Sequence, residues 1–214
     1  MIRLLVLLAA TTVLAATTAE GQKPQVSITL PEATALATEP PTVKSSFLIT
    51  DGATHDLLRN GFPARLHYRL ERWTTGGWFD DIAAEAEWDV VVRYDALKKI
   101  FQVFRVAGGR TASLGSFATI AEADAAVGAA FPAPIRAPRR GQRGYYNLVL
   151  DIEALSLTEL DEVERWLKGE LTPAVRGKKN AGTAVGRGVK TVVVRLLGGE
   201  RRRYEARTPT FRAN

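Results

Sequence analysis

Alternation of apolar and polar side chains is the clearest pattern in this chain. In residues 62–70 every second position is apolar, and the positions between them carry Pro, Arg, His and Arg. A second alternation covers residues 84–92, with Glu and Asp at the polar positions. A period of two is typical of strands with one buried and one solvated face. Shorter runs of strand character are found in residues 26–30, 43–49, 100–106, 145–152 and 203–211.

Helical periodicity is confined to shorter segments. Capping residues and helix-stopping Gly or Pro predict a helical turn at residues 55–59 and an Ala-rich helix at 120–130. An acidic amphipathic pattern predicts a third helix near residues 157–167. Residues 183–197 fit either a helical or a strand period, and we favour the helix. The prediction is a β-rich α+β fold, an antiparallel sheet or β-sandwich of about seven strands with two or three helices.

The first nineteen residues have the pattern of an export signal. Arg3 precedes an apolar run at residues 4–16, and small residues allow cleavage after Ala19 or slightly earlier. The alternative is an uncleaved anchor, although the run is shorter than the roughly 20 apolar residues that span a bilayer. We therefore expect a bacterial protein exported to the periplasm or beyond. Residues 20–24 form a short leader.

The remaining residues, 25–212, are expected to form one globular domain. Its composition, 46% hydrophobic and 24% charged, is typical of a folded chain. Residues 31–41 are a Pro- and Ala-rich connection, and residues 176–182 a flexible basic insert. The chain has no cysteine, so we expect neither disulfides nor a lipoprotein anchor. We expect no transmembrane segment after the signal.

Positive charge gathers toward the C-terminus. Residues 176–214 hold eleven Lys or Arg and two Glu, a net of +9, whereas residues 20–175 hold seventeen basic and twenty-one acidic residues, a net of −4. A basic region favours an anionic partner, and export makes nucleic acid the wrong class. The expected partner is an anionic component or a protein of the cell envelope. The alternative is pairing with the protein's own acidic face.

Chemistry-bearing residues are sparse, and no cofactor or metal site is expected. The two histidines, His55 and His67, lack the spacing of a zinc site or a nucleophilic triad. The candidate catalytic residues are Asp80 and Asp81, since acids beside aromatic side chains are typical of sugar-cleaving sites. The alternative, which we favour, is that they cap a turn while Trp73, Trp78 and Phe79 fold back on the sheet.

Three functions are therefore considered. The first is a non-enzymatic binding or accessory module of the envelope, the second a hydrolase of envelope polymer using Asp80 and Asp81. The third is peripheral association with an anionic membrane surface through residues 185–203. The candidate interaction residues are Trp73, Trp78, Phe79, Arg187, Lys190, Arg195, Arg201, Arg202 and Arg203.

A family resemblance points the same way. The stretch at residues 55–73, the Trp-Phe-Asp-Asp sequence at 78–81 and the Val-Arg-Tyr-Asp-Ala-Leu sequence at 92–97 follow one another in this order. Together they resemble the bacterial exported family catalogued as domain of unknown function 4390. The resemblance covers roughly residues 25–212.

The resemblance implies an exported, β-rich envelope protein, without an activity or catalytic residues to transfer. It also implies structural roles for Gly61 and Pro63 at the tight turn into the strand, where Gly avoids Cβ strain and Pro fixes φ. The Gly- and Lys-rich insert after Pro173 departs from the family pattern.

Overall fold

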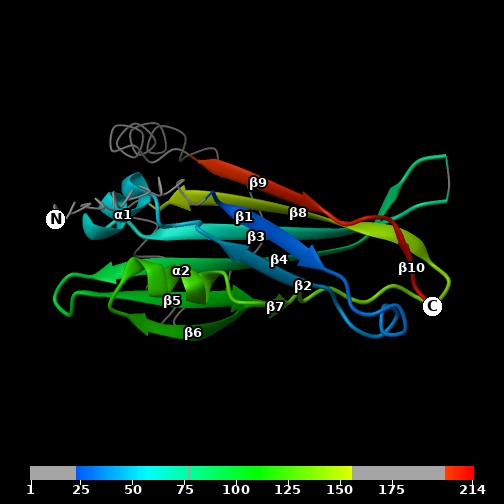
Figure 1. Cartoon of the computed structure of the whole chain (residues 1–214), viewed down its shortest axis with the longest axis horizontal. Coiled ribbons are helices and arrows are strands. Elements are labelled where there is room, and N and C mark those ends of the chain that lie inside the picture. Colours follow the sequence, from blue (N-terminus) through cyan, green and yellow to red (C-terminus); the bar gives the residue numbers. More distant parts are fainter. Residues whose placement is uncertain (1–22, 77, 156–200) are drawn as a thin grey trace, which may run out of the picture.

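The computed structural model describes residues 23–76, 78–155 and 201–214. Two antiparallel sheets and two helices make up this part of the chain (Figure 1). The predicted β-rich α+β class is confirmed. The predicted signal, the helix near 157–167, the insert at 176–182 and the segment at 183–197 lie outside the described residues.

The larger sheet has seven strands in the order β10-β8-β3-β4-β5-β6, with β9 also paired to β8. At its centre, β3 pairs with β4 on one side and with β8 on the other. Strands β3 to β6 follow one another as a meander. The bounds are β3 Ala64–Thr74, β4 Asp81–Asp95, β5 Ile100–Ala107, β6 Arg110–Phe117, β8 Arg143–Ala154, β9 Arg202–Arg207 and β10 Phe211–Arg212.

A smaller sheet, in the order β1-β2-β7, lies with α2 over one face of the larger sheet (Figure 1). Its bounds are β1 Gln25–Thr29, β2 Thr42–Ser46 and β7 Phe131–Pro132, and α2 spans Ile120–Val127. Val43, Ala123 and Val127 are buried there with the alternating apolar residues of the large sheet. The predicted alternation therefore separates a core face from a charged face. The core-face residues of the two central strands are Ala64, Leu66, Tyr68, Leu70, Ala86, Trp88, Val90 and Val92.

Helix α1, Gly52–Arg59, begins three residues earlier than the predicted turn at 55–59 and ends where the sequence predicts. The Asp51 side chain accepts a hydrogen bond from the Thr54 amide at 2.9 Å, which makes Asp51 the N-cap. At the other end the Gly61 and Phe62 amides bond back to Leu58 and Leu57. Gly61 has a φ of +85°, the left-handed conformation that such a stop requires.

Helix α2 is shorter than predicted, ending at Val127 and not at residue 130. Thr119 and Glu122 form the N-terminal capping box. At the C-terminus, Gly128 lies against β2 so closely that a Cβ there would be 1.9 Å from the Ser45 carbonyl oxygen. The chain leaves the helix at this contact because Phe131 then pairs with Val43 in the smaller sheet.

The predicted last strand, 203–211, is interrupted. Strands β9 and β10 are separated at Thr208, whose hydroxyl accepts a hydrogen bond from the Tyr146 amide at 3.0 Å. Pro209 follows and has no amide hydrogen for a ladder. In the described part of the chain, neither helix is long or apolar enough to cross a membrane.

Candidate functional site

The hairpin between β3 and β4 projects from one end of the larger sheet, the end at which the C-terminus also lies (Figure 1). At its turn Trp78 is 98% exposed and Phe79 is 83% exposed, and Ile82 at the start of β4 is half exposed. The expectation that Trp78 and Phe79 fold back on the sheet is therefore wrong. Residues 75, 76 and 78–80 lie beyond the last strand pair, Thr74 with Asp81, so the sheet offers the Trp78 and Phe79 rings no surface to cover.

Trp73 does lie on the sheet, where it braces the base of the hairpin. Its ring stacks on Tyr145 at 6.1 Å between centroids, and its indole N–H donates to Glu71 at 2.9 Å. The Arg207 guanidinium lies 3.6 Å from the centre of the Tyr145 ring. Burial raises the pKa of Tyr145, against the opposing charge of Arg207. These contacts fix the root of a projecting aromatic tip.

Four arginines lie at the same end of the sheet as this root. Arg143 lies beside the hairpin, because its carbonyl accepts a hydrogen bond from the Thr75 amide at 3.0 Å. Arg212 pairs with Arg143 across β10 and β8. Arg139 and Arg140 precede Gly141, whose amide bonds to the Ala213 carbonyl at 2.7 Å.

All four of these guanidinium groups are exposed, and none forms an ion pair with a carboxylate in the described part of the chain. We call residues 74–76 and 78–82 together with Arg139, Arg140, Arg143 and Arg212 the hairpin end. Arg139, Arg140 and Arg143 are close together in sequence, but nothing local predicts the contact of Arg143 with the Trp-containing turn. Arg212 belongs to the basic C-terminal region, and its place beside Arg143 follows only from the pairing of β10 with β8.

Asp80 and Asp81 are both exposed on the hairpin. The Tyr145 hydroxyl donates to the Asp80 carboxylate at 3.2 Å, and Asp81 pairs with Thr74 at the start of β4. Neither carboxylate lines the pocket beside α1 or the small pocket next to Tyr68 and Trp88. The contacts with Tyr145 and Thr74 replace the expected role of the two acids as turn caps. The geometry adds no argument for a pair of acids acting on one bond.

The charged face of the larger sheet carries an ion-pair ladder. Arg65 donates to both carboxylate oxygens of Asp89 at 3.0 Å, and His67 donates to Asp89 at 2.8 Å. The hydrogen bond to Asp89 raises the pKa of His67. Burial alone would raise the pKa of Asp89, but its bonds to His67 and Arg65 lower it. His67 is thus held by the carboxylate of Asp89, which Arg65 also binds.

The arginines at 201–203 are engaged internally. Arg201 and Arg203 each donate to Asp151 at 2.9 Å, and Asp151 is buried. The bonds from Arg203 and Arg201 lower the pKa of Asp151 to about 2. These contacts match the alternative of pairing with the protein's own acidic residues. Arg187, Lys190 and Arg195 lie outside the described residues.

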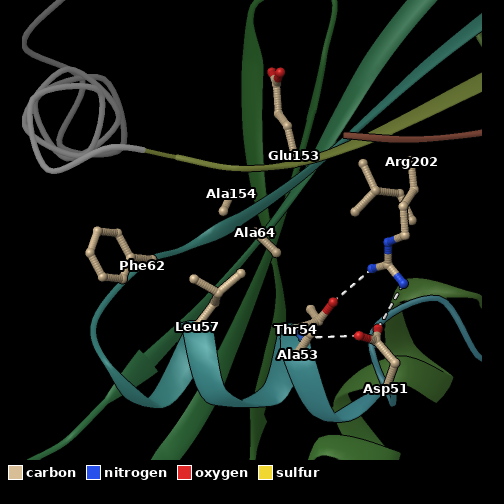
Figure 2. A pocket seen from close by; sticks show the side chains of 10 residues that line it. Asp51, Ala53, Thr54, Leu57, Phe62, Ala64, Glu153, Ala154 and Arg202 are labelled. Carbon is tan, nitrogen blue, oxygen red and sulfur yellow. Dashed lines mark hydrogen bonds and ion pairs between the residues drawn. The ribbon is translucent and has the colours of Figure 1, made fainter. Parts of the chain in front are cut away.

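Arg202 closes the side of a pocket of about 150 Å³ between α1 and the ends of β3, β8 and β9 (Figure 2). Its guanidinium donates to Asp51 at 2.8 Å, to the Thr54 hydroxyl at 2.7 Å and to the Leu48 carbonyl at 3.1 Å. Leu57 lines the apolar side of the pocket. Because the arginine already has three acceptors, the pocket offers a ligand little unsatisfied polar surface.

Gly61 and Pro63 lie where the chain leaves α1 for β3. Pro63 is buried, and its carbonyl accepts a hydrogen bond from the Leu155 amide at 2.7 Å. In the described ranges, no three His, Asp or Glu side chains gather as metal ligands.

Comparison with known proteins adds no relative. No family model, no curated protein and no solved structure matches this chain. Only the geometry of the hairpin end bears on what the protein does.

Proposed function

We propose that this protein is a non-enzymatic binding module of the bacterial cell envelope whose hairpin end holds an anionic partner. The observation that carries the proposal is the combination, at one end of the sheet, of two fully projecting aromatic rings and four exposed arginines without carboxylate partners among the described residues. Export, expected from residues 1–19, places the protein where anionic lipids and polymers are abundant.

The aromatic rings and the arginines of the hairpin end each have a physical reason to bind a partner. An exposed Trp–Phe pair leaves apolar area in contact with water, and such area marks interaction sites when it is concentrated. Arginine is weakly hydrated and presents a planar fork that matches phosphate and carboxylate groups. Among the described residues no side-chain acceptor reaches the four guanidinium groups, so their hydrogen-bonding capacity is available to a partner.

The hydrolase hypothesis for Asp80 and Asp81 has less support. Asp80 is hydrogen-bonded to Tyr145, and Asp81 belongs to a strand ladder. The pair would have to act from the convex side of a hairpin, whereas sites that orient a substrate are usually concave.

The proposal is tested by the affinity of the full chain for inorganic polyphosphate at low and high salt. The triple variant Arg139→Gln, Arg140→Gln, Arg143→Gln should bind at least about tenfold more weakly at low salt, because phosphate contacts by arginine are electrostatic and screened. The matched control Lys98→Gln, Lys99→Gln, Arg110→Gln removes three exposed charges away from the hairpin end and should bind almost as the parent does. Equal losses in the two triple variants would contradict the proposal.

A further inference from the structure

We infer that the hairpin end docks on an anionic phospholipid bilayer, with Trp78 and Phe79 entering the headgroup region and the arginines contacting lipid phosphates. This inference rests on the proposed function and names its partner. It differs from the membrane hypothesis based on residues 185–203, because Arg201, Arg202 and Arg203 are occupied by Asp151 and Asp51.

The shape of the tip favours a bilayer over a folded protein. Trp78 and Phe79 project from a convex turn at 98% and 83% exposure. A rigid partner would need a pocket shaped for two adjacent rings, whereas a lipid interface deforms around them. Tryptophan is enriched at membrane interfaces because its ring is apolar and its indole N–H can still reach water or headgroups.

The order of the side chains along the molecule matches the order of groups across a lipid interface. The aromatic rings lie at the turn, and Arg143 lies further back, where its carbonyl meets the Thr75 amide. Arg212 is opposite Arg143 on the neighbouring strand. Long arginine side chains can therefore stay at the level of the phosphates while the rings go deeper.

Two acidic residues in the same hairpin reduce the positive charge of the hairpin end. Asp80 accepts a hydrogen bond from Tyr145 at 3.2 Å, which holds its carboxylate at the root of the hairpin. Asp81 is exposed at the first position of β4. The four arginines exceed these two carboxylates, so the hairpin end keeps a net positive charge and is complementary to an anionic surface.

The experiment is co-sedimentation of the full chain with vesicles of phosphatidylglycerol and phosphatidylcholine, at about 50 mM and about 500 mM salt. The double variant Trp78→Ala, Phe79→Ala should reduce the partition coefficient at least about tenfold. Leu97→Ala is the matched control, since Leu97 is 97% exposed at the turn that follows β4, at the far end of that strand. It should partition as the parent does. All variants share residues 1–22 and 156–200, so differences between them report on the hairpin.

Fluorescence quenching provides a second readout, which locates the Trp78 ring relative to the bilayer. The chain has four tryptophans, and brominated lipids should quench Trp78 alone if it enters the bilayer. The variant Trp78→Phe should keep most of the binding and lose the quenching. Unchanged quenching in this variant, or equal partition of the double variant and the parent, would overturn the inference.

Failure of the inference and failure of the proposed function are distinguishable. If the parent binds polyphosphate through the arginines but does not bind anionic vesicles, the bilayer inference is wrong and the binding module stands. If it binds neither, both are wrong. Binding to pure phosphatidylcholine as strong as to the anionic mixture would also overturn the inference, because the arginines would then contribute nothing.

Discussion

Two groups of arginines in this protein have the same chemistry and different surroundings. Arg201, Arg202 and Arg203 are consecutive in sequence, and each donates to a carboxylate of another element, Asp151 or Asp51. Arg139, Arg140, Arg143 and Arg212 come from two separated segments, and none reaches a carboxylate in the described residues. The consecutive group looks more like a binding patch in sequence, yet the dispersed group is the one left for a partner.

The comparison shows that a run of charge is not by itself a measure of interaction potential. Strand β9 pairs with β8, so alternate side chains of β9 fall on the two faces of the sheet. Arg201 and Arg203 thereby meet Asp151 on the charged face, and Arg202 turns to α1 (Figure 2). Arg139 and Arg140 lie in a loop outside the strands, and within residues 23–76, 78–155 and 201–214 no acidic residue pairs with them.

The largest expected effect comes from a substitution that disrupts the strand pairing at the hairpin end. Gly144 pairs with both Thr74 and Phe211, and a Cβ at this position would lie 2.1 Å from the Trp73 carbonyl oxygen. Because that contact is with backbone, Gly144→Ala should lower the free energy of unfolding by about 3 kcal/mol. Urea denaturation measures it.

Gly52→Ala provides the control for this change. A Cβ at Gly52 meets nothing within 4 Å, and Gly52 is the first residue of α1. Its replacement should change stability by less than about 1 kcal/mol. A stable Gly144→Ala protein would mean that the two strands separate more easily than their close approach indicates.

A smaller effect separates the two arginine groups directly. Arg202→Gln removes a guanidinium that donates to Asp51, Thr54 and the Leu48 carbonyl. It should cost about 2 kcal/mol, since bonds to charged groups are lost and a partly buried acceptor is left unpaired. Arg212→Gln, at the hairpin end, should leave the free energy of unfolding within about 0.5 kcal/mol of the parent. Equal losses in the two variants would remove the distinction between the groups.

The smallest effect is the pH dependence that the ion pairs of Asp151 with Arg201 and Arg203 contribute. The pKa of Asp151 is about 2 in the folded protein, against an ordinary value of 3.8, because Arg203 and Arg201 bond to the carboxylate. A lowered pKa contributes stability above the ordinary value and loses it as the pH falls through the folded value. The parent should therefore lose about 1 kcal/mol between pH 4 and pH 2 from this group, an amount reduced by the exposure of both arginines.

Asp151→Asn should remove that part of the acid sensitivity. Glu205→Gln is the matched control, because Glu205 is exposed on the adjacent strand β9 and should leave the difference between pH 4 and pH 2 unchanged. Thermal unfolding across this range provides the measurement. If Asp151→Asn keeps the full slope of the parent, the ion pairs with Arg201 and Arg203 do not hold in solution.

Much of the fold follows from local sequence. The alternation at residues 62–70 gives β3, and the Asn-Gly sequence at 60–61 marks the end of α1. The errors arise where distant contacts intervene. Helix α2 stops early because Gly128 contacts the Ser45 carbonyl of β2. Trp78 and Phe79 project because the β3–β4 hairpin extends beyond the neighbouring strands.

The role of Asp124 also depends on distant contacts that the sequence does not predict. The Asp124 carboxylate of α2 accepts hydrogen bonds from the consecutive amides of Phe47, Leu48 and Ile49 at 2.7 to 3.0 Å. In sequence this residue is an ordinary polar position of a short helix. Its role depends on the packing of α2 on the chain that follows β2, and Phe47 has a φ of +57° there.

The sequence by itself determined the two central strands β3 and β4, the buried face of each and where α1 ends, because periodicity and helix stops are properties of neighbouring residues. Only the tertiary structure decided which arginines are neutralised and which remain free of carboxylates in the described part of the chain. Antiparallel pairing brings Gly144 beside Thr74 and Arg203 beside Asp151. Charges separated by that much chain meet only after the sheet has formed, so their pairing leaves no local pattern.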